Sequence, residues 1–129
     1  MIVSRRHEPF RYAFEPALPC LIRPYEINRN PLDSKQGQAG LLDLSPNGCK
    51  LETALNFHAQ QNDCKLEIEF ELAGPVRLRG TMLWQELRAH GYRYGIRFET
   101  DHPYDITGEL KAYARQKRRE AAGRPEALT

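Results

Sequence analysis

Residues 64–72 read CKLEIEFEL, a stretch that alternates strictly between apolar and charged side chains. Because successive side chains of a β-strand point to opposite faces, this pattern predicts a strand with one buried face and one solvated face. The alternation resumes at 76–84 after a turn at 73–75, which predicts a hairpin with a three-residue loop. Charge pairing and core burial favour one register for this hairpin. It pairs Glu71 with Arg77, Glu69 with Arg79 and Phe70 with Leu78.

Shorter segments with the same period of two lie on both sides of this hairpin. They predict strands at about 18–25, 39–44, 49–55 and 92–98. Pro19 and Pro24 restrict the first of these strands to an edge or a bent position, because proline donates no backbone hydrogen bond. From Asp105 the period changes to that of a helix, with Asp105 as its N-cap and its end near Ala121.

These elements predict a mainly all-β fold, a small six-stranded antiparallel β-barrel with a C-terminal α-helix that covers one opening. The 129 residues fit one such domain. We divide the chain into a flexible basic N-terminal arm at 1–16, the barrel and helix at 17–121, and a frayed tail at 122–129.

Composition excludes several other classes. No stretch approaches the roughly 20 apolar residues that a membrane span needs, so we expect no transmembrane segment. The basic start of the chain lacks the apolar core of a signal peptide, and we expect a cytoplasmic protein. Three widely spaced cysteines, without a Cys-x-x-Cys pair, favour reduced and buried thiols over disulfides or a metal site. They are Cys20, Cys49 and Cys64.

The sequence offers no recognisable catalytic constellation, and we expect no enzyme. It contains no Gly-x-Ser-x-Gly elbow, no P-loop and no His-Glu-x-x-His. A net charge of +2 does not by itself indicate nucleic-acid binding. Tyr92 and Tyr94 share a strand face with Ile96 and Phe98, which indicates a core role and makes a single-stranded nucleic acid ligand unfavoured.

Two segments indicate a binding function. The first is the arginine-rich start at 5–11, which reads RRHEPFR, and the second is the turn at 43–48, which reads DLSPNG. Together they resemble the PilZ family, whose signature is two nearby arginines followed by Asp/Asn-x-Ser-x-x-Gly between early strands. The resemblance covers roughly residues 5–119, including the strand at 92–98. It implies a non-catalytic receptor for the bacterial second messenger cyclic di-GMP, with no other cofactor.

The resemblance implies a set of ligand-binding residues, namely Arg5, Arg6, Arg11, Asp43, Ser45 and Gly48. Arginine suits a phosphate or the O6/N7 edge of guanine because its planar fork donates two parallel hydrogen bonds. An ionised aspartate accepts hydrogen bonds from the guanine N–H groups. A serine hydroxyl adds a further hydrogen bond, and a glycine permits a positive φ or a close backbone approach to the ligand.

The arginine motif departs from the family pattern in its spacing. The family places three residues between its two arginines, whereas four separate Arg6 from Arg11, and His7 occupies the expected position. Either the arm bulges and Arg6 contacts the ligand, which we favour, or His7 replaces the arginine. His7 is therefore a secondary candidate for the ligand surface. Arg97 is another, because it shares a strand face with Arg93 and Gly95, and cross-strand charge pairing is the alternative role for these arginines. The altered motif leaves open an alternative function, a PilZ-fold interaction adaptor that binds no cyclic di-GMP.

The chain contains no output domain, so a receptor would act through an unidentified partner protein. The family resemblance implies outputs such as motility, exopolysaccharide or biofilm control. The basic residues from Lys111 to Arg119 are expected to form a solvated helix end that complements the helix dipole.

Overall fold

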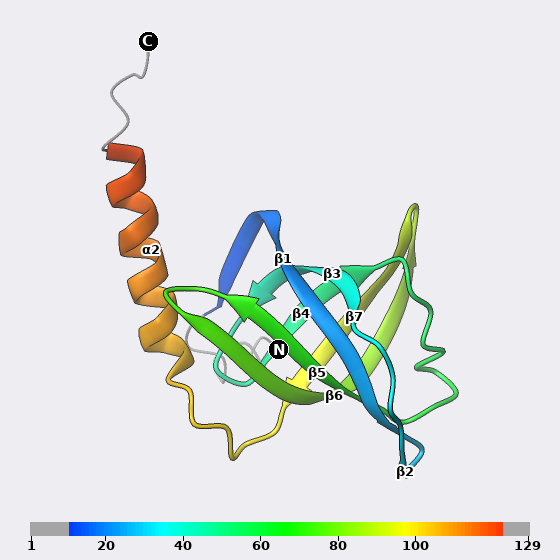
Figure 1. The fold of residues 1–129 in the computed structure, drawn as a ribbon. Helices are drawn as coiled ribbons and strands as arrows, with labels where there is room; N and C mark the ends of the chain where they lie inside the picture. The colour runs from blue at the N-terminus through cyan, green and yellow to red at the C-terminus, as the bar shows by residue number, and fades with distance from the viewer. Residues whose placement is uncertain (1–10, 123–129) are drawn as a thin grey trace, which may run out of the picture.

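The computed structural model describes residues 11–122, which form a closed antiparallel β-barrel followed by one helix (Figure 1). The elements are β1 (Tyr12–Ile27), β2 (Asn30–Pro31), β3 (Gly37–Leu44), β4 (Gly48–Thr53), β5 (Cys64–Glu71), β6 (Pro75–Arg88), β7 (Gly91–Phe98) and α2 (Ile106–Ala122). The strand order is β2-β1-β3-β4-β7-β6-β5, and a further pairing of β1 with β5 closes the barrel. The predicted six-stranded barrel with a C-terminal helix is confirmed, with β2 as one short extra strand.

The core contains the apolar face of every long strand. Leu66, Ile68 and Leu78 of the β5–β6 hairpin are at most 1% exposed. Tyr94 is fully buried, and its hydroxyl donates to the carbonyl of Leu55 at 2.7 Å and accepts from the amide of Phe57 at 2.9 Å. The core role predicted for Tyr94 is therefore confirmed.

The predicted register of the β5–β6 hairpin is wrong by two residues. Glu69 lies opposite Arg77, and Glu71 lies opposite Pro75, so the loop is 72–74 instead of 73–75. The amide of Leu72 donates to the carbonyl of Gly74 at 2.9 Å and fixes this turn. A shift of two residues leaves every side chain on its predicted face, so the sequence pattern is compatible with either register.

Strand β1 is longer and more central than the sequence indicates. It begins at Tyr12, inside the segment predicted as an arm, so the boundary at residue 16 was placed too late. It pairs with β3 on one side and with β5 on the other, and therefore is not an edge strand. Register shifts between Ala13 and Leu18 and between Pro24 and Glu26 bend it, as its prolines predicted.

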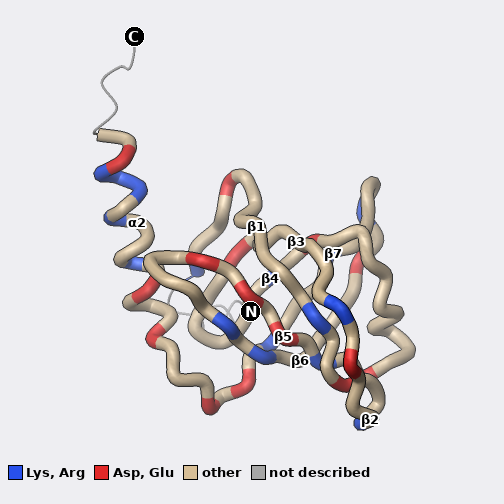
Figure 2. The backbone as a smooth tube through the Cα atoms, viewed as in Figure 1, with Lys and Arg blue, Asp and Glu red and all other residues tan. Residues whose placement is uncertain are grey.

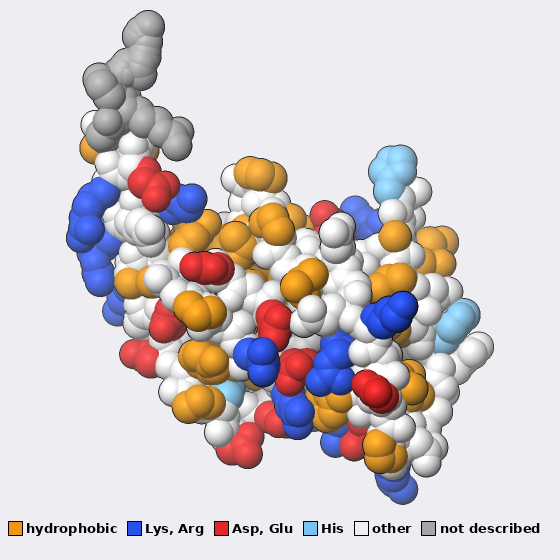
Figure 3. Space-filling model, viewed as in Figure 1, with side chains coloured by type: hydrophobic (Ala, Val, Ile, Leu, Met, Phe, Trp, Pro, Cys, Tyr) orange, Lys and Arg blue, Asp and Glu red, His pale blue; other side chains and the backbone are white. Residues whose placement is uncertain are grey.

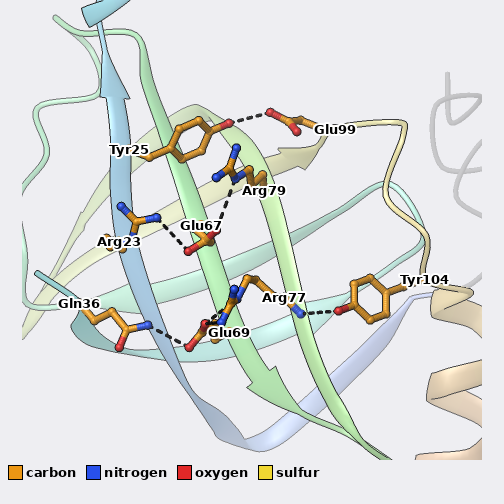
Figure 4. A network of polar contacts seen from close by, with 9 residues as sticks. All are labelled: Arg23, Tyr25, Gln36, Glu67, Glu69, Arg77, Arg79, Glu99 and Tyr104. Atoms are coloured by element: carbon orange, nitrogen blue, oxygen red, sulfur yellow. Dashed lines mark hydrogen bonds and ion pairs between the residues drawn. The ribbon is translucent and has the colours of Figure 1, made fainter. Parts of the chain in front are cut away.

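A ladder of ion pairs crosses the strands that close the barrel (Figure 4). Glu67 of β5 binds Arg23 of β1 at 3.0 Å and Arg79 of β6 at 3.4 Å. Burial acts to raise the pKa of Glu67, but the hydrogen bond and charge of Arg23, with the hydrogen bond of Arg79 and the charge of Arg77, outweigh it. The pKa of this carboxyl therefore lies below its usual range, and the ionised form stabilises the closure.

Helix α2 begins as predicted. The side chain of Asp105 accepts a hydrogen bond from the amide of Gly108 at 3.1 Å, which is the geometry of an N-cap. Ile106 and Leu110 are buried, and the ring of Tyr113 packs edge-on against Tyr12 at 5.9 Å. The distal half of the helix projects away from the barrel and carries most of the helix's Lys and Arg residues (Figures 1 and 2). The helix includes residue 122, one residue more than the sequence predicts, and 123–129 lie outside the described residues.

The three cysteines are free and buried, as expected. Burial raises the pKa of the Cys20 thiol to about 12 and that of Cys64 to about 11, and it raises the pKa of Cys49 as well. Each thiol is therefore protonated at neutral pH and unreactive. Among residues 11–122, no helix has the length and apolar character to cross a membrane.

Candidate functional site

The turn between β3 and β4 is held together by its own polar groups. Ser45 is fully buried, and its amide donates to the carbonyl of Gly48 at 2.9 Å. Its hydroxyl lies 3.2 Å from both the amide and the carbonyl of Gly48. The amide of Phe98 donates to the carbonyl of Asn47 at 2.8 Å, which fastens the turn to β7. In this state, Ser45 shapes the turn instead of presenting its hydroxyl to solvent.

Gly48 is required by the packing of β4 against β7. A Cβ atom at this position would collide with the carbonyl oxygen of Ile96. Its φ is not in the positive region, which among the described glycines is adopted by Gly91. The structure thus shows a close backbone approach to β7, where the sequence had suggested an approach to a ligand or a positive φ.

Asp43 lies at the start of the turn and collects two cations around one buried carboxylate. Its side chain is 8% exposed. Its Oδ1 accepts from Nη1 of Arg11 at 2.7 Å and from the backbone amide of Lys50 at 3.0 Å. The Nζ of Lys50 lies 3.7 Å from Oδ2. Arg11 and Asp43, predicted from separate motifs 32 residues apart, are therefore in direct contact.

These residues border a surface hollow of about 450 Å³ on the outer face of β4, β7 and β6. Its polar lining comes from Arg11, Asp43, Asn47, Lys50, Trp84 and Arg97. Arg97 lies opposite Gly48 across the β4–β7 pair, so this secondary candidate does reach the same hollow. Arg11 and Lys50 are 43% and 40% exposed at their side chains, which leaves both cations accessible from solvent.

Trp84 and Lys50 line this hollow although the sequence did not identify either as a site residue. Strict alternation along 76–84 would place Trp84 on the same face as Met82, in the core or at the rim of the barrel. The structure excludes the core position, because a register shift between Met82 and Trp84 turns the indole to the outer face, where it is 41% exposed. The ring lies across Gly95, where any Cβ would collide with it. A bulge of this kind leaves no signal in the hydrophobic period.

Three predicted site residues, Arg5, Arg6 and His7, lie outside the described residues. The remaining predicted residues, Arg11, Asp43, Ser45 and Gly48, are gathered at or directly beneath the hollow. Arg93, which shares the strand face of Arg97, instead borders a different hollow beside Glu52. No cluster of three or more potential metal ligands occurs within 11–122.

A small closed barrel with one C-terminal helix and a charged surface hollow defines a binding domain. Comparison with known families matches the PilZ domain over residues 5–116, which is most of the chain. This chain therefore belongs to the PilZ family. PilZ domains are non-catalytic domains that bind cyclic di-GMP, so the family is one of receptors and not of enzymes.

Solved structures share the fold at low sequence identity. The PilZ domain of YcgR from Escherichia coli, solved with cyclic di-GMP, is 19% identical with a TM-score of 0.55, and the match covers 88% of this chain and 95% of that one. The PlzA protein of Borreliella burgdorferi, solved in complex with cyclic di-GMP, is 17% identical, also with a TM-score of 0.55. That match covers 81% of this chain and 39% of the PlzA chain. A comparison with curated proteins finds no significant match.

Proposed function

We propose that this chain is a cyclic di-GMP receptor that binds its ligand in the hollow beside the β3–β4 turn. The main support for this proposal is the contact between Arg11 and Asp43 at the edge of that hollow. Two solved proteins with the same fold hold cyclic di-GMP, which supports the same ligand class for this chain. The hollow is also lined by three cationic side chains and one carboxylate, and this excess of positive charge favours a dianionic ligand.

Each group of the hollow has a role that its chemistry fits. The guanidinium groups of Arg11 and Arg97 suit phosphate oxygens or the O6/N7 edge of guanine. The carboxylate of Asp43 suits the guanine N–H donors. The exposed indole of Trp84 offers a flat surface on which a guanine base can stack, an interaction of about 1–3 kcal/mol per base. Ser45 and Gly48 act indirectly, by holding the turn that carries Asp43.

In this proposal, the N-terminal arginines complete the site from the other side of the ligand. Arg5 and Arg6 precede Arg11 in the chain, and closure of this segment over the ligand would present a new surface to an output protein. The family resemblance suggests motility, exopolysaccharide or biofilm control as the output, and the basic start of the sequence, without a signal-peptide core, suggests a cytoplasmic location.

Titration calorimetry of the purified protein with cyclic di-GMP tests this function directly. We expect one saturable transition with a Kd of about 1 μM or tighter, equivalent to about −8 kcal/mol. GTP at the same concentration should give no heat, because it lacks the second guanine. An absence of heat with cyclic di-GMP at hundreds of micromolar would exclude the receptor and leave the PilZ-fold adaptor as the function.

The spacing of the arginine motif needs its own set of variants. If Arg6 contacts the ligand, Arg6→Ala should weaken binding as much as Arg11→Ala, and His7→Ala should be silent. If His7 takes that position, His7→Arg should tighten binding, and the affinity should rise as the pH falls through about 6.5. The double variant Arg5→Ala/Arg6→Ala is the stricter test, because either arginine alone can substitute in part for the other.

A further inference from the structure

Helix α2 carries two kinds of side chain on opposite sides. At about 100° per residue, Ile106, Leu110 and Tyr113 lie on one side of the helix. Ile106 and Leu110 are buried, and the ring of Tyr113 packs against those of Tyr12 and Phe14 at 5.9 and 5.7 Å. This apolar side therefore faces the barrel. The opposite side carries four exposed cations, which we call the basic stripe, namely Lys111, Arg115, Arg118 and Arg119.

The basic stripe is not neutralised within the part of the chain that the structure describes. The side chains of its four members form no hydrogen bond or ion pair with residues 11–122. Lys117, by contrast, lies on the barrel side of the helix, 3.5 Å from Glu120 and 5.5 Å from the centre of the Tyr113 ring. Figure 3 shows Lys and Arg side chains gathered on the side of α2 that faces away from the barrel. The stripe is therefore an accessible surface of a single charge.

Neither the helix dipole nor the stability of the helix explains the whole stripe. The dipole favours cations in the last turn, where Arg119 lies, whereas the stripe begins at Lys111 in the first half of the helix. Arg115 is four residues from Lys111 and Arg119 and three from Arg118, and like charges at these spacings destabilise a helix. The stripe therefore weakens the isolated helix, and an anionic partner would relieve the repulsion.

The extent of the basic stripe distinguishes among anionic partners. The stripe is about 12 Å long at 1.5 Å per residue. Figure 2 shows acidic residues at the barrel end of the helix, and Asp101 and Asp105 are exposed there. A nucleic acid duplex carries phosphates along its whole length, so it would meet these acids as well as the cations. A membrane is also disfavoured, because an interfacial helix inserts an apolar side, and that side of α2 is buried against the barrel.

We propose that the basic stripe is a docking surface for a short acidic helix of a partner protein. Glutamates spaced four and three residues apart form a matching stripe on that helix, so that two helices lying side by side bring carboxylates opposite the cations. Three of the four cations are arginines, whose planar fork pairs a carboxylate through two parallel hydrogen bonds. The basic stripe shares no residue with the ligand hollow, and the proposal does not rest on cyclic di-GMP binding.

The probe is the blocked peptide Ala-Glu-Ala-Ala-Ala-Glu-Ala-Ala-Glu-Glu-Ala-Ala-Ala, which repeats the spacing of the basic stripe with glutamate. It is titrated into the ¹⁵N-labelled full chain and followed by amide chemical shifts. We expect saturable shifts that centre on residues 111–119, with a Kd on the order of 1 mM that weakens as salt is added. Shifts that are non-saturable or centred outside α2 would overturn the proposal.

A second peptide tests whether the arrangement of charge matters. Ala-Glu-Ala-Ala-Glu-Ala-Ala-Glu-Ala-Glu-Ala-Ala-Ala has the same composition but spreads its glutamates around the helix, and both peptides carry the same side-chain staple on an uncharged side so that both are helical. The spread peptide should bind at least about threefold more weakly. Equal affinity of the two peptides, or tighter binding of a short DNA duplex or of phosphatidylserine vesicles at the same ionic strength, would exclude the acidic helix as the partner.

Charge reversals separate this surface from general attraction to an anionic peptide. Arg115→Glu/Arg118→Glu should abolish the shifts, whereas Lys35→Glu/Arg88→Glu, an equal change of net charge at exposed positions outside α2, should leave them intact. Arg115→Glu alone should also slow amide exchange along α2, because it replaces repulsive pairs with attractive ones. Equal peptide affinity in the two double variants would mean that only net charge matters, and faster exchange would mean that the stripe stabilises the helix. Either result would contradict the proposal.

Discussion

Two regions on the outer surface of this barrel contain the same kinds of side chain, a buried carboxylate between cations, but differ in their balance of charge. At the closure of β1, β5 and β6, Glu67 lies between Arg23 and Arg79, and its side chain is 11% exposed. Beside the β3–β4 turn, Asp43 is buried to a similar degree at 8% and also contacts two cations. The surroundings of the two carboxylates differ. At the closure, Glu69 and Arg77 add a second acid that is paired with its own cation, whereas Arg97 adds a cation without an acid beside Asp43.

The comparison shows how charge balance separates stabilisation from binding. Where acids and cations alternate across paired strands, the charges satisfy one another and fix the register. Where cations exceed acids around a hollow, the excess is available to an anion from solution. The closure should therefore respond to mutation mainly in stability, and the hollow mainly in ligand affinity.

The largest expected effect is on ligand affinity at the hollow. Arg11→Ala should weaken cyclic di-GMP binding by about ten- to hundredfold, or about 1.5–3 kcal/mol for a lost charge-assisted hydrogen bond. Its melting temperature should change little, because the Arg11 side chain is 43% exposed. Arg88→Ala, at the exposed tip of the β6–β7 hairpin, is the matched control and should bind as the wild type does. Calorimetry measures the Kd of both variants, and thermal melting measures their stability. Normal binding by Arg11→Ala would mean that the ligand does not bind in this hollow.

A smaller loss of affinity should follow from moving the indole of Trp84. In Gly95→Ala the new methyl group displaces the ring that lies across this position. We expect a three- to tenfold weaker Kd, about half of a base–aromatic stacking energy of about 1–3 kcal/mol. Tryptophan fluorescence reports both the displaced ring and the titration, because Trp84 is the single tryptophan of the chain. A displaced ring with unchanged affinity would remove Trp84 from the ligand surface.

At the closure, mutation should change the stability of the fold more than the affinity for the ligand. Glu67→Gln should lower the free energy of unfolding by about 1 kcal/mol, because it removes the charge that both Arg23 and Arg79 contact. Urea unfolding measures the loss, and the Kd for cyclic di-GMP should stay within twofold of the wild type. A large change in affinity with unchanged stability would contradict the division between the two regions.

The smallest expected effect is the pH dependence of the stabilisation that the Glu67 carboxylate gives to the fold. Because the pKa of Glu67 is lower in the folded state, its stabilisation is complete above the unfolded value near 4.5. It is lost as the pH falls through the folded pKa. The difference in unfolding free energy between wild type and Glu67→Gln should therefore be constant near neutral pH and shrink below about pH 4.5. A difference that grows on acidification would mean that Glu67 is stabilised in its protonated form.

Much of the fold could be predicted from neighbouring residues alone. Strands β3, β4 and β7 begin and end within two residues of the predicted positions, and α2 begins as predicted and ends one residue later. The N-cap at Asp105 was also predictable, because it needs only a side chain and the amide of Gly108 three residues later. The proximity of Arg11 to the Asp43 turn followed from family resemblance, and no local pattern in the sequence contains it.

The sequence by itself determined which face of each strand is buried, because alternation is a property of consecutive residues. Tertiary structure alone decided the register of β5 on β6, the second partner of β1 and the bulge that turns Trp84 outward. Two registers of the β5–β6 hairpin bury the same side chains, so hydrophobicity does not distinguish them. The closure of β1 on β5 and the outward turn of Trp84 depend on residues far apart in the chain, whose contacts form only when the barrel closes.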